Sequence, residues 1–289
     1  MKILLFLCAF TLCFSVSRAQ VSVNIKMDRP QYLAHEPVTA VVTITNRSGR
    51  ELSFASKAEG SIAHSWLDFS MRDAGGRGMS KRHNKVFQKA VIPAGRSMSR
   101  RVNLSGIFTV SRVSNYAVTA HVSQPGLDDT SYTSNSGHFT VGSGNTIYQQ
   151  PYGVPKSGAP KREYKVVTFN DGRRTSIYAQ VMNVDTGFAL STFRLSEFLS
   201  FVDPQMALDG KNQLHVLYLA TPEIFVHATV NQDGGHSGTE YFKRVGGRQP
   251  RFVSFSDGKI AISGAVPYDP KKEAETRQKA RSTSERPPE

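Results

Sequence analysis

Two segments each place a histidine next to a serine, at His64-Ser65 and at His236-Ser237. These are the residue types of a hydrolytic nucleophile and its base. Such a nucleophile works only when the base lies beside its hydroxyl and a third group orients the base. Neither pair has the Gly-x-Ser-x-Gly spacing of a glycine-framed elbow, and nothing in the sequence marks a third partner. We therefore predict no catalytic residue and a protein that is not an enzyme.

Three histidines raise the question of a zinc site. His215 and His227 are twelve residues apart, and His227 and His236 are nine apart. Zinc ligands usually stand at short fixed spacings. His215 in QLHVLYL and His227 in IFVHATV instead alternate with apolar neighbours, which is typical of strands. We expect each to face solvent or a cross-strand partner, and we predict no metal ligand.

Other ligand chemistries are also weakly represented. Asn170, Asp171, Asn231 and Asp233 offer oxygens for calcium, but they stand in FNDGRR and VNQDGG, which suit hairpin turns. The segment GGRGMSKR has glycines and cations without the spacing of a phosphate-binding loop. No pair of carboxylates is marked for glycoside hydrolysis. The sequence predicts no cofactor and leaves the binding residues unknown.

The elements that would position such groups follow a segment with the layout of an export signal. Residues 1–19 contain a basic start, the apolar run Ile3–Val16 and a small–x–small site ending at Ala19. This is typical of a cleavable signal peptide. Both cysteines, Cys8 and Cys13, lie within it, and neither follows the small residue that a lipoprotein signal needs. We predict a secreted or periplasmic protein whose mature part lacks cysteine.

Positive charge is concentrated in one stretch. The formal net charge is +13, and residues 72–101 contain a single acid, Asp73. Their cations are Arg72, Arg77, Lys81, Arg82, Lys85, Lys89, Arg96, Arg100 and Arg101. A basic surface attracts polyanions such as anionic lipid or acidic polysaccharide. We expect a solvated basic face able to contact a polyanion, and no nucleic-acid partner because the chain is predicted to be exported.

Residues 20–141 alternate apolar and polar positions in short runs separated by turn residues. These runs are predicted to be strands at 21–25, 38–45, 67–71, 91–92, 101–104, 116–122 and 138–141. No long run with the 3.6-residue period of a helix competes with them. The pattern predicts a β-sandwich.

The order of these strands resembles a bacterial immunoglobulin-like domain, and it is similar to macroglobulin-type domains and the BsuPI proteinase-inhibitor fold. The likeness rests on QYLAHEPVTAVVTITNRSGREL, LDFSMRDAGGRGM, VIPAGRSMSRRVNL and SNYAVTAHV. In the family pattern a glycine often precedes the late tyrosine, whereas Asn115 precedes Tyr116 here. Tyr116 is then either a tyrosine corner, bonded to backbone, or an ordinary buried aromatic.

Two segments are predicted to lack regular structure. Residues 142–162 are rich in proline and glycine without apolar periodicity, which predicts an extended linker. Residues 269–289 are charged and contain no large apolar side chain, so burial cannot offset the entropy of ordering them. We expect this tail to be disordered, with a charged helix over Lys271–Arg281 as the alternative.

Residues 163–268 contain an internal repeat. Three segments each place an Asp-Gly pair between two β-rich runs, at Asp171-Gly172, Asp209-Gly210 and Asp257-Gly258. Such a pair predicts a hairpin, because glycine adopts positive φ without a Cβ clash. Further β-rich runs, GFALSTFRLSEFL, EIFVHATVNQDGG and TEYFKRV, lie between the copies.

The spacing of these copies, 38 and 48 residues, resembles that of β-propeller blades. The segment is too short to close a ring of four blades. It therefore forms an open twisted sheet or small sandwich, completes a ring by oligomerising, or is a simple duplication of hairpins. We favour the first.

Three functions follow from this layout. The favoured one is an exported, non-enzymatic binding or accessory protein, in which the Ig-like module docks or spaces and the β-repeat module contacts a protein or glycan of the cell envelope or extracellular space. The second is a proteinase inhibitor, implied by the BsuPI likeness, with the basic loop Ser80–Lys85 as a trypsin-substrate mimic. The third is a glycan-acting hydrolase in the propeller-like half. A homo-oligomer formed through the repeat is a further expectation.

Overall fold

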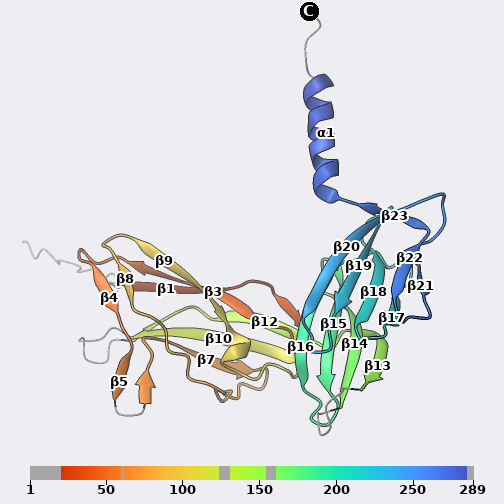
Figure 1. Ribbon diagram of the computed structural model, residues 1–289. Coiled ribbons are helices and arrows are strands. Elements are labelled where there is room, and N and C mark those ends of the chain that lie inside the picture. The colour runs from red at the N-terminus through yellow and green to blue at the C-terminus, as the bar shows by residue number, and fades with distance from the viewer. Residues whose placement is uncertain (1–20, 60–61, 124–130, 154–160, 285–289) are drawn as a thin grey trace, which may run out of the picture.

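A computed structural model describes residues 21–59, 62–123, 131–153 and 161–284 of the chain (Figure 1). The protein is nearly all β, with 56% of it in strands and one short helix, which confirms the predicted all-β class. Its described part forms several antiparallel sheets and no closed barrel or propeller. The predicted signal peptide, residues 1–19, lies outside the described residues. No helix in these ranges has both the length and the apolar character needed to cross a membrane.

The N-terminal module has two sheets around one core. The first has the order β1-β3-β9, from β1 (Val21–Met27), β3 (Thr39–Asn46) and β9 (Ser97–Asn103). The second is centred on β10 (Ser114–Ser123), with β7 (Leu67–Asp73) on one side, and β11 (Ser131–Thr133) and β12 (Gly137–Gly142) on the other. Strand β2 (Gln31–Leu33) adds in parallel to β12. Short ribbons pair β4 (Leu52–Phe54) with β8 (Ala90–Ile92) and β5 (Lys57–Glu59) with β6 (Ile62–His64), and the turn η1 (Leu104–Gly106) follows β9.

Alternation along the strands builds this core. In β3, Ala40, Val42 and Ile44 are buried while the intervening side chains are half-exposed. Because successive side chains of a strand point to opposite faces, each sheet has one apolar face, and the two apolar faces pack together. All seven strands predicted for this half overlap strands of the structure. The half is therefore a sandwich-like pair of sheets.

Tyr116 is a tyrosine corner. Its hydroxyl donates a 2.8 Å hydrogen bond to the carbonyl of Arg112, four residues upstream. Its ring stacks on Phe139, with ring centroids 5.2 Å apart. This bond to upstream backbone is the corner geometry, and here it forms with Asn115 in the place where a glycine was expected.

The prediction of a linker over residues 142–162 is wrong for its first half. Strand β13 (Asn145–Tyr152) pairs antiparallel with β14 (Arg162–Asn170). The glycines that suggested flexibility serve close packing instead. Gly144 has φ +67°, and a Cβ there would lie 2.6 Å from a methyl carbon of Val167 and 2.9 Å from the carbonyl oxygen of Thr168. The chain thus crosses tightly from one module to the next.

The C-terminal module consists of two antiparallel meanders packed face to face. The first has the order β13-β14-β15-β16 and adds β15 (Thr175–Asn183) and β16 (Ala189–Glu197). The second has the order β17-β18-β19-β20-β23, from β17 (Gln205–Leu208), β18 (Leu214–Leu219), β19 (Ile224–Val230), β20 (His236–Arg244) and β23 (Ala265–Tyr268). Strands β21 (Arg251–Ser254) and β22 (Ile260–Ser263) form a separate hairpin. Buried side chains of β14, β15, β18 and β19 fill the space between the two sheets.

Both outer faces of this module are partly covered. The outer face of the first sheet packs on the N-terminal module, where Leu33 joins Val167 and Tyr178 in one buried cluster. On the second sheet, Phe252 and Ile262 of the β21–β22 hairpin pack on a buried apolar cluster of β18 and β19. A further propeller blade would have to stack on one of these faces. The arrangement therefore fits the favoured small sandwich better than a ring completed by stacking.

The three Asp-Gly pairs form hairpin turns, as predicted. In each turn the aspartate Oδ1 accepts a backbone N–H from two residues further on, which is an Asx turn. Gly172 and Gly258 have the expected positive φ, at 86° and 78°. In the middle hairpin the left-handed residue is Asn212, with φ 57°, rather than Gly210. The shared aspartate therefore reflects turn capping, and glycine is required only at two of the three sites.

The expectation of a disordered tail is wrong for residues 270–284, which form the helix α1 (Pro270–Ser284). Asp269 caps it by accepting the N–H of Lys271 at 2.9 Å, and proline occupies the first helical position. Glu273 and Arg277 form an ion pair one turn apart. These local interactions order a segment that buries no apolar face, and the helix points away from the sheets (Figure 1).

Candidate functional site

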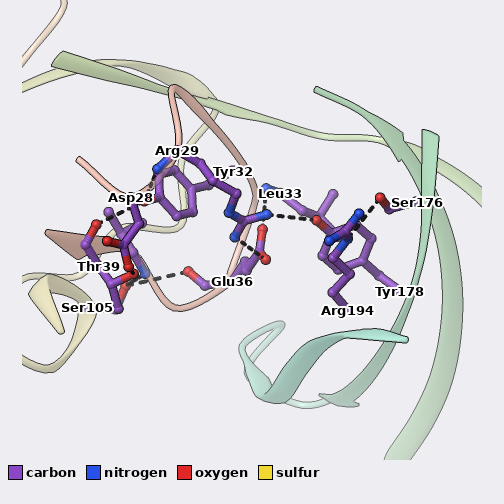
Figure 2. A network of polar contacts seen from close by, with 11 residues as sticks. Asp28, Arg29, Tyr32, Leu33, Glu36, Thr39, Ser105, Ser176, Tyr178 and Arg194 are labelled. Carbon is purple, nitrogen blue, oxygen red and sulfur yellow. Dashed lines mark hydrogen bonds and ion pairs between the residues drawn. The ribbon is translucent and has the colours of Figure 1, made fainter. Parts of the chain in front are cut away.

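The turn Leu33–Glu36 fastens the two modules together (Figure 2). The N–H of Ala34 donates to the carbonyl of Gly142 at 2.8 Å, and the carbonyl of Ala34 accepts from the Gln180 amide at 3.0 Å. Leu33 is 1% exposed, against Val167, Phe169 and Tyr178 of the C-terminal module. Burying one leucine side chain contributes about 1.5–3 kcal/mol, so this turn is a substantial part of the interface.

A polar network surrounds that turn. The Arg29 guanidinium forms an ion pair with the buried carboxylate of Glu36 and donates to the hydroxyl of Tyr178 at 3.2 Å. Glu36 also accepts the N–H of Leu33 at 3.0 Å. Tyr32 lies under the guanidinium, 4.6 Å from ring centroid to carbon. Burial raises the pKa of Tyr178, so its hydroxyl stays protonated. The network satisfies the polar groups that the interface buries and fixes the geometry of the turn.

His35 is the half-buried residue of this turn. Its φ is +69°, in the left-handed region where a side chain with a Cβ is strained. Glu36 N–H donates to the Leu33 carbonyl at 3.0 Å, so His35 holds the turn position that usually carries glycine. Strained residues of this kind cluster at binding and catalytic sites. The strain therefore makes the surroundings of His35 a candidate site.

His35 lines a cleft of about 440 Å³ between the modules. The N-terminal module contributes Arg82, Ser105 and the segment 108–111, and the C-terminal module contributes Phe188 and Ala189 from the turn that leads into β16. Phe188 is 55% exposed, whereas Phe108 is buried. The cleft thus has an apolar part, several hydroxyls and two basic groups.

The electrostatics of the cleft favour an anion. The residues lining it include Arg82 and His35 and no aspartate or glutamate. Arg82 is held by its backbone N–H, which donates to the carbonyl of Ile107 at 2.7 Å, while its side chain is exposed. Burial lowers the pKa of His35, and the positive charge of Lys165 lowers it further. A bound anion would offset that charge and favour the protonated imidazole.

The histidine–serine pairs singled out in the sequence do not form a nucleophile and base. His64 is exposed, and the Ser65 hydroxyl accepts the N–H of Phe87 at 3.3 Å. His236 instead shares a 2.9 Å hydrogen bond with Thr239.

The histidines considered for zinc partly come together. His215 Nδ1 and His227 Nε2 are 2.8 Å apart, on the outer face of the second sheet, and His236 is not in this contact. Within the described ranges no group of three or more His, Cys, Asp or Glu is arranged to hold a metal ion. The pair is flanked by Asp209 and Glu240.

The oxygens considered for calcium serve the turns. The Asn170 side-chain Oδ1 accepts the N–H of Gly172 at 2.7 Å, and the Asn231 side-chain Oδ1 accepts the N–H of Gly235 at 2.7 Å. Asp171 accepts the N–H of Arg174 at 2.9 Å, and Asp233 forms an ion pair with Arg162.

The cations of the basic segment 72–101 have different surroundings. Arg82 lies at the cleft, Arg100 packs over Trp66 with 5.6 Å from carbon to ring centroid, and Arg96 lies in the turn before β9. In the loop Ser80–Lys85, Lys81 pairs with Asp68 at 2.6 Å.

No protein-family model matches the chain, and no curated protein matches it in sequence.

Sequence reasoning singled out one residue of the cleft, Arg82, which it placed in the basic run and in the loop Ser80–Lys85. The cleft residues come from four separate stretches of the chain, so no local spacing links them. One signal was available: the segment AHEP places a histidine at a turn before β3, where the backbone needs positive φ. Without the fold, that requirement cannot be read from the residues.

Proposed function

We propose that this chain is an exported, non-enzymatic binding protein that holds an acid-bearing ligand in the cleft between its two modules. The N-terminal module is, in this proposal, an Ig-like sandwich of the macroglobulin or BsuPI type. The two sheets around one core, the tyrosine corner and the parallel β2–β12 pair support that assignment.

The observation that carries the proposal is the cleft itself. It joins the cationic Arg82 and the titratable His35 to an exposed aromatic ring, Phe188, without a lining carboxylate. A guanidinium recognises carboxylates through paired hydrogen bonds, and an apolar wall adds contact area. A ligand that fits carries one acidic group beside an apolar group, as acidic peptides and some acidic glycans do.

The junction between the modules is rigid, which supports a preformed binding site rather than one that closes around its ligand. The turn Leu33–Glu36 is anchored by the backbone hydrogen bond from Ala34 to Gly142, by the Gln180 amide and by the Arg29–Glu36 pair. Groups held in position before binding lose less entropy when the ligand arrives. The strain at His35 fits the same view, since it orients an imidazole at the cleft.

The experiment is a binding screen with matched charge reversals. The chain without residues 1–19 is applied to an array of peptides and of neutral and uronate-bearing oligosaccharides, and each hit is measured by calorimetry. Arg82→Glu should weaken binding of acid-bearing hits at least about tenfold, or about 1.4 kcal/mol. Arg96→Glu makes the same charge change away from the cleft and should leave affinity within about twofold.

Acidity should strengthen binding. The lowered pKa of His35 leaves the free imidazole neutral at pH 7.5, and protonation on acidification adds a positive charge beside the anion. Equal losses in the two charge-reversal variants, binding of neutral probes only, or chemical turnover of a bound probe would each contradict the proposal.

A further inference from the structure

Four side chains form a line across the outer face of the second C-terminal sheet. His215 of β18 and His227 of β19 are diagonal neighbours in the ladder, so both rings lie on the same face. Their ring nitrogens are 2.8 Å apart. At one end His215 Nε2 lies 3.4 Å from Asp209 Oδ2, and at the other His227 Nδ1 lies 3.0 Å from Glu240 Oε2.

The β21–β22 hairpin covers this line. Phe252 presents its ring to both imidazoles, with centroids 6.2 Å from His215 and 5.6 Å from His227. The base of the hairpin is held by Gln205, which donates to the Pro250 carbonyl at 2.9 Å. The two histidines are 9% and 8% exposed. The two rings are therefore almost closed off from water, whereas Glu240 reaches the surface.

The tip of the hairpin is pinned beside Asp209. The N–H of Gly210 donates to the carbonyl of Gly258 at 2.9 Å, so the Asp209-Gly210 and Asp257-Gly258 turns meet backbone to backbone. A Cβ on Gly258 would lie 2.9 Å from the Gly210 Cα. The position of Asp209 thus depends on the hairpin being closed.

Proton counting shows that two neutral rings do not satisfy this line. Each neutral imidazole carries one N–H and one bare nitrogen. If His227 donates to Glu240 and His215 donates to His227, then His215 Nε2 is bare and faces the Asp209 carboxylate. That atom is indeed buried without a hydrogen-bond partner. The opposite tautomers only move the bare nitrogen to the Glu240 end.

One added proton satisfies all three contacts. His215 then donates from Nε2 to Asp209, one N–H lies between the rings, and His227 donates to Glu240. A second proton would place two N–H groups against each other over the 2.8 Å gap between the rings. The site therefore accommodates one extra proton and repels the next.

We propose that Asp209, His215, His227 and Glu240 form a site for a single proton, and that exclusion of a second proton keeps the β21–β22 hairpin closed. Acidification beyond that point separates the two rings and releases the hairpin.

The charged groups around the rings fit this count. Asp209 reaches them from the β17–β18 turn, and Glu240 reaches them from β20. The described hairpin brings no charge to the rings, since Asp257 and Lys259 pair with each other at its tip and Arg251 is exposed. Burial lowers the pKa of His227, a charge on His215 lowers it further, and Glu240 raises it.

The sign of the effect on stability follows. Below about pH 6.5 the unfolded chain protonates both histidines, whereas the folded site takes up one proton. Stability from this site is therefore complete above that pH and is lost on acidification. The folded-to-unfolded ratio should fall about tenfold per pH unit for the one excluded proton.

The test compares three proteins by urea unfolding between pH 7.5 and 5. His227→Gln keeps an acceptor for His215 and removes the excluded proton. The fall of about tenfold per pH unit in the folded-to-unfolded ratio that this proton causes in the unchanged protein should therefore be absent from the variant. His138→Gln, at an exposed site on β12, should follow the unchanged protein. Equal pH dependence of His227→Gln and the unchanged protein would overturn the proposal.

A second measurement needs no variant. In the protein labelled with ¹⁵N at histidine, the protonated ring nitrogens of this pair should rise from two to three of the four as the pH is lowered, and stay at three while the hairpin is closed. Amides of residues 251–263 should lose hydrogen-exchange protection before those of β18 as the pH falls further. Two neutral rings at every pH, two fully protonated rings under a closed hairpin, or simultaneous loss of protection would contradict the proposal.

Discussion

The protein places histidine in two opposite environments. His35 stands at an open cleft, held in a strained backbone conformation, with Arg82 in the same lining and the charge of Lys165 acting on it. His215 and His227 lie under a hairpin, between two carboxylates, with their hydrogen bonds directed at each other. The pKa of His35 and that of His227 are both lowered by burial. The two pKa shifts have the same direction, but the charges beside each ring decide what protonation does at that site.

Acid should act on the two sites in opposite ways. A proton on His35 adds attraction for an anionic ligand, whereas a second proton in the His215–His227 pair breaks a hydrogen bond and loosens the fold. A lowered histidine pKa therefore has no single functional meaning, because the partners of the ring decide what protonation does.

The largest expected effect comes from the anchor beneath the His35 turn. Leu33→Ala removes a buried side chain at the module interface and should lower the free energy of unfolding by about 2–5 kcal/mol. It should also weaken ligand binding, because the turn that positions His35 shifts. Urea unfolding measures the loss. Leu190→Ala, at a leucine that is 49% exposed, is the control and should stay within about 0.5 kcal/mol; equal effects would mean that Leu33 is not an anchor.

The next largest effect tests how closely the β21–β22 hairpin packs beside the His215–His227 pair. Gly258→Ala adds a Cβ at φ +78°, 2.9 Å from the Gly210 Cα, and should cost about 2–3 kcal/mol of stability. Gly246→Ala is the matched control, since its φ is +62° and nothing lies within 4 Å of the added Cβ. It should cost only the strain of the left-handed backbone, about 1 kcal/mol. Thermal or urea unfolding that ranks the two variants equally would contradict the close contact of the turns.

A smaller effect of opposite sign is expected at the cleft. His35→Gly relieves the left-handed strain and should leave the protein unchanged or more stable by up to about 1 kcal/mol, while weakening binding of acid-bearing ligands. His35→Ala keeps the Cβ and its strain, so it should lose the same affinity without the gain in stability. Calorimetry and urea unfolding of both variants separate the two effects. A His35→Gly variant that is clearly less stable would show that the imidazole supports the fold.

The smallest expected effect concerns Glu240, the exposed end of the line of four side chains. Glu240 raises the pKa of His227, so Glu240→Gln should lower that pKa further and widen the gap to the unfolded value. Stability lost below about pH 6.5 should then increase, by only a few tenths of a kcal/mol because the carboxylate is 68% exposed. Unfolding at pH 7.5 and pH 5.5 measures the difference. A smaller loss at pH 5.5 in the variant would contradict the assigned role of Glu240.

The sequence predicted the local elements of the fold better than its long-range contacts. Strands with clean alternation and hairpins with Asp-Gly turns were found, because both signals lie within a few residues. Strand β13 was missed, since Gly144 was taken for flexibility although it is required by the approach of Val167. The helix α1 was expected to be disordered because its stability comes from the Asp269 cap and not from an apolar face.

The site was less predictable for a related reason. His215 and His227 were correctly expected on strands, but their pairing depends on the register between β18 and β19. The cleft depends on how the modules dock, which rests on Leu33 and the Arg29–Glu36 pair rather than on any motif. Residues such as His35 gain meaning only after that docking is known.

The projecting helix α1 has a practical consequence for binding measurements. Its 15 residues, at about 1.5 Å per residue, form a spacer of about 22 Å at the carboxyl end of the described chain. The helix begins next to β23, at the far edge of the second sheet from β17. An affinity tag or surface attachment fused there would stand clear of the cleft, so an immobilised protein should present its binding site to solution without a further linker.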